Sequence, residues 1–550
     1  MRGKTAHREG HPMQTPTPLE ELLDLAADAL GRDRRTLHAA AAGSPFVTLG
    51  GGLGQAMRLQ GRAGERLGLA LDLAALLGPA PLADVLARAL PLPPRPEPAQ
   101  PSAAQDLLPS QLAALTAQPY TGAAAVHRML SAELTGPLDM AALRTALSAL
   151  GARHEGLRTA FASSARGPVR RVLDDWSVPL MSTPQAYEGE GAVTAVQSRI
   201  AADVDRLVGH PDRPPLAFVL TRLAADRHLL TFLHHDAVAD AWSAALVWRE
   251  LLADYARAVR RRPLDLAPAP GPDAVAARAA ALDRSGALRA LTAERVERLR
   301  EFPEVVDLVA SAQRPAVFDF RGERLLFGLG AELRDAVDAT AARAGVPHTA
   351  VVLAAWALAA GRRAGREWLL VGTEMPRRPT ADLQRTVAPC TVRVPVGCAL
   401  EGGTDYFLRG IACAFSEGLR YADLDPADLA RELGVRGDRS RTALTQVAFA
   451  ARDELLPAAL EAGPLTARFH HGHLGGATAD AELAVLGWRE APLLSLEFAS
   501  SVLTRTEAAA LAQEVVGALE ALAAAGPAAA VEDLLPLRLD LASLAPVPVS

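Results

Sequence analysis

Two adjacent histidines and a nearby aspartate are the side chains in this sequence best suited to chemistry. They lie in "TFLHHDAVADAWSAAL" (231–246), where His234 and His235 end an apolar run and Asp240 precedes a helical pattern. An imidazole titrates near neutral pH, so it can accept a proton or position a reacting group. The pattern is therefore consistent with one histidine as a base or positioning group and Asp240 as its anchor.

A structural role and a metal site are the alternatives for the same residues. Asp240 could cap the following helix while both histidines are partly buried and hydrogen-bonded. A metal site built from His234, His235, Asp236 and Asp240 would have poor ligand spacing. Adjacent strand residues point to opposite faces, so at most one of the two histidines should enter a given cleft.

A strand before the motif and a helix after it should position these residues. Residues 228–235 form an apolar strand-like run, and residues 241–259 carry apolar side chains at helical spacing. The histidines then stand where a strand ends and a loop begins, which is a common place for catalytic side chains.

The rest of the chain divides into four parts. Residues 18–90 have helical spacing throughout, and the proline-rich segment 91–105 reads as an extended linker. Beyond it, strand-like runs such as 126–136, 216–223 and 228–235 alternate with helical stretches such as 139–154 and 241–259, which indicates a mixed α/β architecture. A second Pro/Ala-rich stretch at 263–275 divides this region, and we expect lobes at 106–275 and 276–540.

Composition excludes several classes of function. Half of the 550 residues are apolar, and a net charge of −6 gives no electrostatic reason to expect nucleic acid or an anionic membrane as a partner. Cys390, Cys398 and Cys413 lack any CxxC spacing and fit reduced thiols. The polar N-terminus has no apolar core of the kind a signal peptide needs, and no apolar run is long enough for a membrane span. We expect a cytoplasmic protein.

Four motifs resemble those of one known family. The stretch around His235 is similar to the HHxxxDG motif of the condensation domains of nonribosomal peptide synthetases, which have the chloramphenicol acetyltransferase-like fold. "GARHEGLRTAF" (151–161) resembles RHExLRTxF, and "VGTEMPRRPTADLQRTVAPCTVRVPV" (371–396) resembles IGTxxxNR…VNTxxxR. "RGDRSRTALTQVAFAARDE" (436–454) resembles RDxSRxPLFQVMF. The four stand in the family's order and spacing, and the resemblance covers roughly residues 106–540.

The resemblance implies an acyltransferase that joins a thioester on one carrier protein to an amine, or sometimes a hydroxyl. His235 matches the family's second histidine and is the expected catalytic residue, and His234 supports the loop. Asp240 is expected to pair with Arg158. The candidates that line the substrate tunnel are Ala241, Trp242 and Ser243, and Ala241 replaces the glycine that closes the family motif.

The resemblance also implies the partners. No cofactor is expected to bind directly, because the substrates arrive on the phosphopantetheine arms of other carrier proteins or synthetase modules. Heterocyclase relatives replace the histidine motif with DxxxxD, which is absent here, and no GxSxG elbow supports a hydrolase. The competing hypothesis is a non-catalytic scaffold of an assembly line.

The N-terminal helical unit resembles an acyl or peptidyl carrier protein, a four-helix fold. In that family a serine after the glycine turn carries the phosphopantetheine, but "LGGGLGQAMRL" places Leu53 at this position. Leucine has no hydroxyl and cannot form the phosphodiester, so we expect a structural role for residues 18–90.

A second histidine cluster occurs in "RFHHGHLGG" (468–476). Alternation would place His471 and His473 on one strand face, while His470 faces the other way. No acidic or cysteine ligand is close in sequence, so we expect a solvated turn and no metal.

Overall fold

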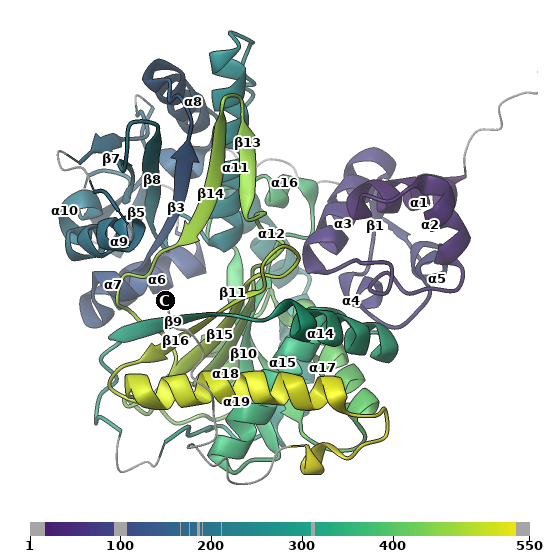
Figure 1. Cartoon of the computed structure of the whole chain (residues 1–550). Coiled ribbons are helices and arrows are strands. Elements are labelled where there is room, and N and C mark those ends of the chain that lie inside the picture. The colour runs from purple at the N-terminus through teal and green to yellow at the C-terminus, as the bar shows by residue number, and fades with distance from the viewer. Residues whose placement is uncertain are drawn as a thin grey trace, which may run out of the picture.

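The computed structural model describes residues 17–92, 107–164, 167–174, 176–183, 187–189, 191–210, 212–309 and 314–534. Figure 1 shows a helical N-terminal unit beside two lobes that lie one above the other. Each lobe is built around a six-stranded sheet, and the candidate site lies between the two.

The N-terminal unit contains five helices and one very short sheet. Its elements are α1 (Pro18–Leu30), α2 (Arg34–Ala41), α3 (Leu53–Leu67), β1 (Leu69–Ala70), α4 (Leu73–Leu76), α5 (Leu82–Leu86) and β2 (Leu90–Pro91). The predicted helices are present, whereas the paired two-residue strands β1 and β2 were not predicted, because two residues carry no periodicity. Because β2 pairs with β1, Pro91, the first residue of the predicted linker, belongs to the N-terminal unit. Residues 93–105 of the predicted linker lie outside the described residues.

The N-lobe sheet positions the histidine motif. Its strand order is β13 (Ala459–Ala462), β14 (Leu465–His471), β3 (His127–Thr135), β8 (Arg227–His235), β7 (Leu216–Arg222) and β6 (Leu180–Ser182). Apolar side chains of α8 (Met140–Arg153) and α11 (Ala241–Val259) cover one face, and those of α9 (Ala192–Ala202) and α10 (Val204–Val208) cover the other. The predicted strands at β3, β7 and β8 and the predicted helices α8 and α11 are confirmed.

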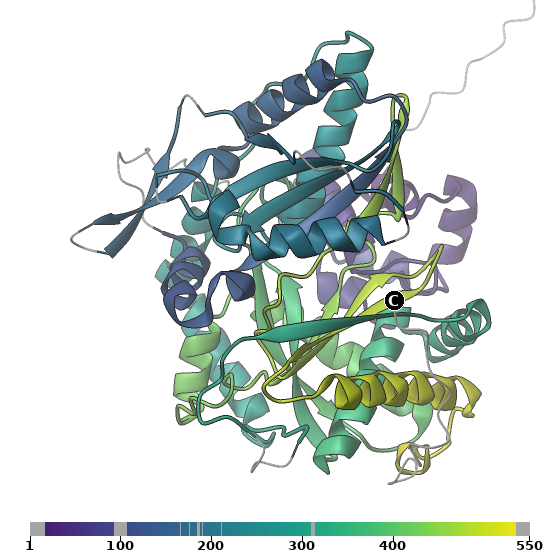
Figure 2. The ribbon, with the colours of Figure 1, turned by 60° about the vertical axis from the view of Figure 1, so that its left-hand side comes forward.

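One feature of this sheet departs from the predicted division into lobes at residue 275. Strands β13 and β14 come from the second half of the chain, yet β14 pairs with β3 in the N-lobe sheet. Figures 1 and 2 both show the yellow-green β13 and β14 rising beside the N-lobe strands. The crossover could not be predicted because strand pairing between distant segments leaves no local pattern.

The C-lobe sheet forms the other wall of the site. Its strand order is β11 (Thr391–Ala399), β10 (Trp368–Pro376), β12 (Val447–Ala451), β15 (Ala481–Gly487), β16 (Leu493–Ala499) and β9 (Gly322–Gly328). The helices that share its core are α14 (Ala331–Ala344), α15 (His348–Ala364), α17 (Thr404–Gly418) and α19 (Arg505–Ala524). α15 is apolar along most of its length because it is buried in this core.

The remaining elements connect these layers. They are α6 (Pro109–Thr121), α7 (Ala123–Val126), β4 (Thr159–Ser164), β5 (Gly167–Val172), α12 (Asp273–Arg284), α13 (Ala287–Leu299), α16 (Ala381–Gln384) and α18 (Pro426–Glu432). Within the described ranges, no single helix has the length and apolar character to cross a membrane. Among the described helices, α14 and α15 are long and apolar enough only when taken together, and a bend of 102° separates them.

Candidate active site between the two lobes

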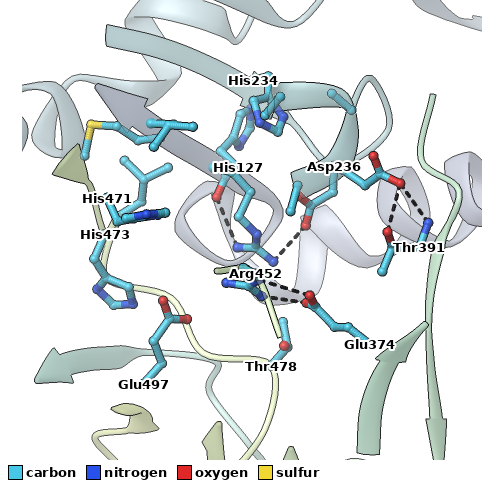
Figure 3. Close-up of a pocket in the computed structure, with 18 of the residues that line it drawn as sticks. His127, His234, Asp236, Glu374, Thr391, Arg452, His471, His473, Thr478 and Glu497 are labelled. Carbon is cyan, nitrogen blue, oxygen red and sulfur yellow. Dashed lines mark hydrogen bonds and ion pairs between the residues drawn. The ribbon is translucent and has the colours of Figure 1, made fainter. Parts of the chain in front are cut away.

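A cavity of about 330 Å³ lies between the lobes, at the end of β8. Its walls come from β3 and the β8 loop in the N lobe, from the end of β14, and from β9, β10, β11, β15 and β16 in the C lobe. Figure 3 shows how histidines and charged side chains from both lobes converge here. No single sequence motif predicts the whole site, because the residues that line it come from segments separated by more than 300 residues.

The two motif histidines point in different directions, as strand alternation predicts. Among the described residues, the cavity lining includes His234 but not His235. Both side chains are buried, with residue exposures of only 1%. Burial disfavours the charged imidazolium and lowers the pKa of His234 to about 4, so His234 is neutral at physiological pH.

The hydrogen bonds of His235 determine which nitrogen carries its proton. The backbone N–H of Ala237 donates to Nδ1 over 2.9 Å, so Nδ1 is an acceptor and the neutral ring carries its proton on Nε2. Nε2 lies 3.2 Å from Oε1 of Gln118, on α6. Burial, with lesser contributions from His127 and His234, lowers the pKa of His235 to about 3. His235 is therefore a neutral hydrogen-bond donor in this structure.

His127 has the opposite tautomer, and the sequence analysis did not single it out. Its Nδ1 lies 2.8 Å from the carbonyl oxygen of Ala123, which can only accept, so the neutral ring carries its lone pair on Nε2. Nε2 is buried and has no hydrogen-bond partner among the described residues, although His127 lines the cavity. The rings of His127 and His235 meet edge-on, with their centroids 4.7 Å apart. In the sequence, His127 is marked only as a polar residue at the start of an apolar strand-like run.

The predicted pairing of Asp240 with Arg158 is wrong. Asp240 instead forms an ion pair with Arg378, whose Nη2 donates to Oδ1 at 2.9 Å and to Oδ2 at 3.1 Å. The guanidinium of Arg158 donates to the backbone carbonyls of Gly151 and Leu173. Arg378 reaches Asp240 because the segment after β10 packs against the motif loop, a contact between lobes that the spacing of motifs does not reveal.

Asp240 also holds three further parts of the site in place. Its carboxylate accepts the backbone N–H groups of Ser243, Cys390 and Thr391 at 2.8, 2.9 and 2.8 Å. The first of these bonds makes it the N-cap of α11, so the capping interpretation is confirmed. Burial raises its pKa, but Arg378 and the bonds from Ser243 outweigh burial and leave the pKa below the ordinary value.

The three tunnel candidates differ in position. Ala241 lines the cavity, whereas Trp242 lines a smaller neighbouring cavity and donates from Nε1 to the carbonyl of Gln384 at 2.9 Å. The hydroxyl of Ser243 is buried and donates to the carbonyl of Ala388 at 2.9 Å, and Ser243 lines neither cavity. Ser243 is therefore a structural residue, and its prediction as a lining residue is wrong.

Leu53 lies beside the site although it is distant in sequence. It opens α3 and lines the smaller cavity, of about 50 Å³, together with Ala241 and Trp242. Hydrogen bonds to the C lobe hold the N-terminal unit there, among them one from Arg489 to the carbonyl of Gly50 at 3.3 Å. The N–H of Gly54 donates to Glu454 at 2.6 Å, and the side chain of Gln384 donates to the carbonyl of Met57 at 2.6 Å.

The second histidine cluster belongs to the same cavity. β14 ends at His471, and both His471 and His473 line the cavity, so the predicted solvated turn is wrong. Burial lowers the pKa of His471 to about 3. His470 faces the other way and lies 3.2 Å from Glu133 on β3. Over the described residues, no group of three or more His, Cys, Asp or Glu side chains has an arrangement that could hold a metal ion.

Comparison with known proteins places most of the chain in one family. Residues 106–468 match the family model described as Condensation domain. Phosphinothricin tripeptide synthetase PhsC of Streptomyces viridochromogenes is 30% identical over 322 residues, which are 58% of this chain and 30% of that protein. Chondramide synthase cmdD of Chondromyces crocatus is 29% identical over 355 residues, 62% of this chain and 9% of that protein. The chain thus spans less than a third of the length of these relatives.

Solved structures share the fold. The X-domain from teicoplanin biosynthesis superposes with a TM-score of 0.68 and 24% identity, covering 80% of this chain and all of that one. The first condensation domain of the calcium-dependent antibiotic synthetase, in complex with a substrate analogue, superposes with a TM-score of 0.67 and 23% identity, again over 80% and 100% of the two chains.

Proposed function

Since the chain belongs to the condensation-domain family, we propose that it forms an amide bond between a carrier-bound acyl thioester and an amine acceptor. An ester product from a hydroxyl acceptor is the variant of the same reaction. The observation that carries the proposal is the position of the motif imidazole. The ring of His235 is held in one tautomer and packs edge-on against His127, which lines the cavity between the lobes.

The hydrogen bonds support distinct roles for two histidines. The amine nitrogen attacks the thioester carbonyl carbon, the C–N bond forms, and the C–S bond breaks. The hydrogen bond from His235 Nε2 to Gln118 first breaks. His235 then donates from Nε2 to the carbonyl oxygen as negative charge develops there. His127 Nε2, which has a free lone pair, accepts the proton that the attacking nitrogen loses, and that proton passes to the departing thiolate.

A fixed ion pair supports the geometry of this reaction. Asp240 and Arg378 tie the motif loop to the C lobe, so the two walls of the cavity keep one spacing. Positioning two tethered reactants contributes as much as proton transfer or more. We expect Asp240 to act through position only, because its carboxylate already accepts six hydrogen bonds from the protein.

The experiment that tests the proposal uses acyl-loaded carrier proteins with free and carrier-bound amines. Product is read by intact-mass spectrometry for the native protein, for His235→Ala and for His127→Ala. The matched control is His210→Ala, because His210 is exposed. We expect a loss of about 100-fold or more in each of the first two variants and none in the control. Equal rates in native protein and His235→Ala would remove His235 from the mechanism.

A non-catalytic scaffold is the second candidate, and two observations favour it. Gln118 already accepts the hydrogen bond from Nε2–H of His235, and Leu53, which the resemblance to carrier proteins aligns with their serine, lines the smaller cavity. No product from any carrier and amine, together with stable binding of a loaded carrier, would support the scaffold over the condensing enzyme.

A further inference from the structure

Charged side chains form a row across the C-lobe sheet where it faces the cavity. Arg324 on β9 is the register partner of Glu497 on β16, and Glu497 is the partner of Glu482 on β15. Directly opposed residues of neighbouring strands share one face of the sheet, and all three line the cavity. This wall of the cavity is thus strongly charged.

Most of this charge is already paired inside the protein. Arg452 donates to Glu374 at 2.6 Å and to Glu482 at 2.9 Å, and Arg393 forms an ion pair with Glu482. On the N-lobe side, Arg128 lies 2.9 Å from Asp236. Figure 3 shows the bonds between Arg452 and Glu374 as dashed lines. Asp240, which also lines the cavity, pairs with Arg378, so four of the five carboxylates in the described cavity wall hold an arginine.

Glu497 is the exception. It makes no hydrogen bond and no ion pair with any described residue, although it lines the cavity. The guanidinium of its register partner Arg324 donates instead to the carbonyls of His471 and Gly472, at 2.5 and 2.9 Å. Both ring nitrogens of His473 are engaged as well, with Gly475 and Gly476.

Glu497 is nevertheless ionised. Burial raises its pKa, but the nearby side chains, foremost His473 and Arg324, outweigh burial and leave the pKa below the ordinary value. Glu497 is half-buried and lines the cavity, so its carboxylate, which can only accept, is open to a donor that enters there. The missing partner is therefore a donor, and a cation satisfies it best.

Ser495 gives an independent indication of a ligand at the same place. It precedes Glu497 by two residues on β16, so both side chains lie on one face of the strand. Ser495 is 1% exposed, it lines the cavity, and its hydroxyl has no hydrogen-bond partner among the described residues. A hydroxyl and a carboxylate together match the several donors of an ammonium group.

We propose that Glu497 and Ser495 form a subsite for a protonated amino group on the side chain of the aminoacyl substrate. This inference rests on the proposed function and names its substrate class: a basic aminoacyl unit. The bound ammonium is distinct from the reacting amine, because Figure 3 shows Glu497 at the opposite end of the cavity from His127 and His234. The reacting nitrogen lies near the histidines while its side chain extends to the C-lobe sheet.

The test compares two amines that differ only at the far end of the side chain. L-Lysinamide carries the terminal ammonium, and L-norleucinamide has the same side-chain carbons without the ammonium. Calorimetric titration of the native chain should give an affinity for lysinamide at least about tenfold higher, the usual effect of a charge-assisted hydrogen bond. Glu497→Gln should abolish the difference, Ser495→Ala should reduce it, and Glu461→Gln, at an exposed carboxylate, should leave it unchanged.

The outcomes separate this inference from the proposed function. Equal affinity of the native chain for both amines overturns the subsite, as does full discrimination in Glu497→Gln. If Glu497→Gln does not fold, the affinities of the native chain and of Ser495→Ala for the two amines decide whether the subsite exists. Preferential binding of lysinamide without any amide product would leave the subsite standing and count against the condensing enzyme. Amide formed equally fast from both amines would overturn the subsite and leave the enzyme standing.

Discussion

The guanidinium of Arg378 donates to both carboxylate oxygens of Asp240, at 2.9 and 3.1 Å, and thereby joins the motif loop of the N lobe to the segment that follows β10 in the C lobe. The side chain of Arg378 is fully buried. The same Nη2 also donates to the hydroxyl of Ser243 and the carbonyl of Ala388, and Nη1 donates to the carbonyls of Leu383 and Thr386. The two lobes therefore meet through a buried ion pair at the motif itself.

Removal of Asp240 should destabilise the protein. Asp240→Ala leaves the Arg378 guanidinium buried without its counter-charge, and such losses cost about 3–5 kcal/mol in the free energy of unfolding. Urea unfolding measures this cost, and a double-mutant cycle with Arg378→Ala should give a strong coupling energy. The same cycle with Arg158→Ala is the control and should give coupling near zero. Coupling to Arg158 as large as that to Arg378 would contradict the observed pair.

The motif histidines should make stability depend on pH. The pKa values of His234 and His235 in the folded protein are about 4 and about 3, against about 6.5 for an unfolded histidine. The unfolded chain thus binds more protons between these values, so stability is complete above about pH 6.5 and is lost as the pH falls toward 4. For His234 this amounts to about 3 kcal/mol.

Unfolding at several pH values with His234→Asn checks this dependence. The variant should have a shallower slope of stability against pH than the native protein between pH 6.5 and 4. Asp236, whose pKa burial raises to about 6, acts in the opposite direction below that pH, but it is present in both proteins and cancels in the comparison. Identical slopes would show that His234 is not held neutral.

Gln118 should restrain the reaction by occupying His235. Its Oε1 accepts from Nε2–H at 3.2 Å, and a neutral hydrogen bond of this kind contributes about 0.5–1.5 kcal/mol. Gln118→Leu keeps the volume but removes the acceptor, so amide formation should become about 2–10-fold faster. Gln118→Glu keeps an acceptor and should not accelerate the reaction. A loss of rate in Gln118→Leu as large as in His235→Ala would mean that Gln118 orients the ring.

Glu454 should keep the N-terminal unit on the C lobe. Its carboxylate accepts the N–H of Gly54 at 2.6 Å in the first turn of α3, where backbone N–H groups have no partner within the helix. In Glu454→Ala, amide exchange in residues 52–60 should become faster, because loss of a bond to a charged group costs about 1.5–3 kcal/mol. Hydrogen-exchange mass spectrometry measures it, with Glu461→Ala as the exposed control. Unchanged exchange would show that apolar packing alone holds the unit.

Much of the fold and part of the site follow from the sequence alone. Alternation predicted β3, β7 and β8, helical spacing predicted α8 and α11, and the order of four motifs indicated the family that the comparisons then showed. These signals are local, because side-chain direction repeats every two residues in a strand and about every 3.6 in a helix. The cap formed by Asp240 is local for the same reason, since it lies within one turn of the helix it starts.

Tertiary structure alone decided which residues meet at the site. The partner of Asp240, the free lone pair of His127, the burial of His471 and the unpaired carboxylate of Glu497 all depend on contacts across lobes or on strand register. No periodicity records such contacts, because a side chain's partner is set by how two distant segments pack. The tertiary structure also decides which ring nitrogen carries the proton. Nε2 is a donor in His235, because Nδ1 of that ring accepts a backbone N–H, and Nε2 is an acceptor in His127, because Nδ1 of that ring donates to a carbonyl.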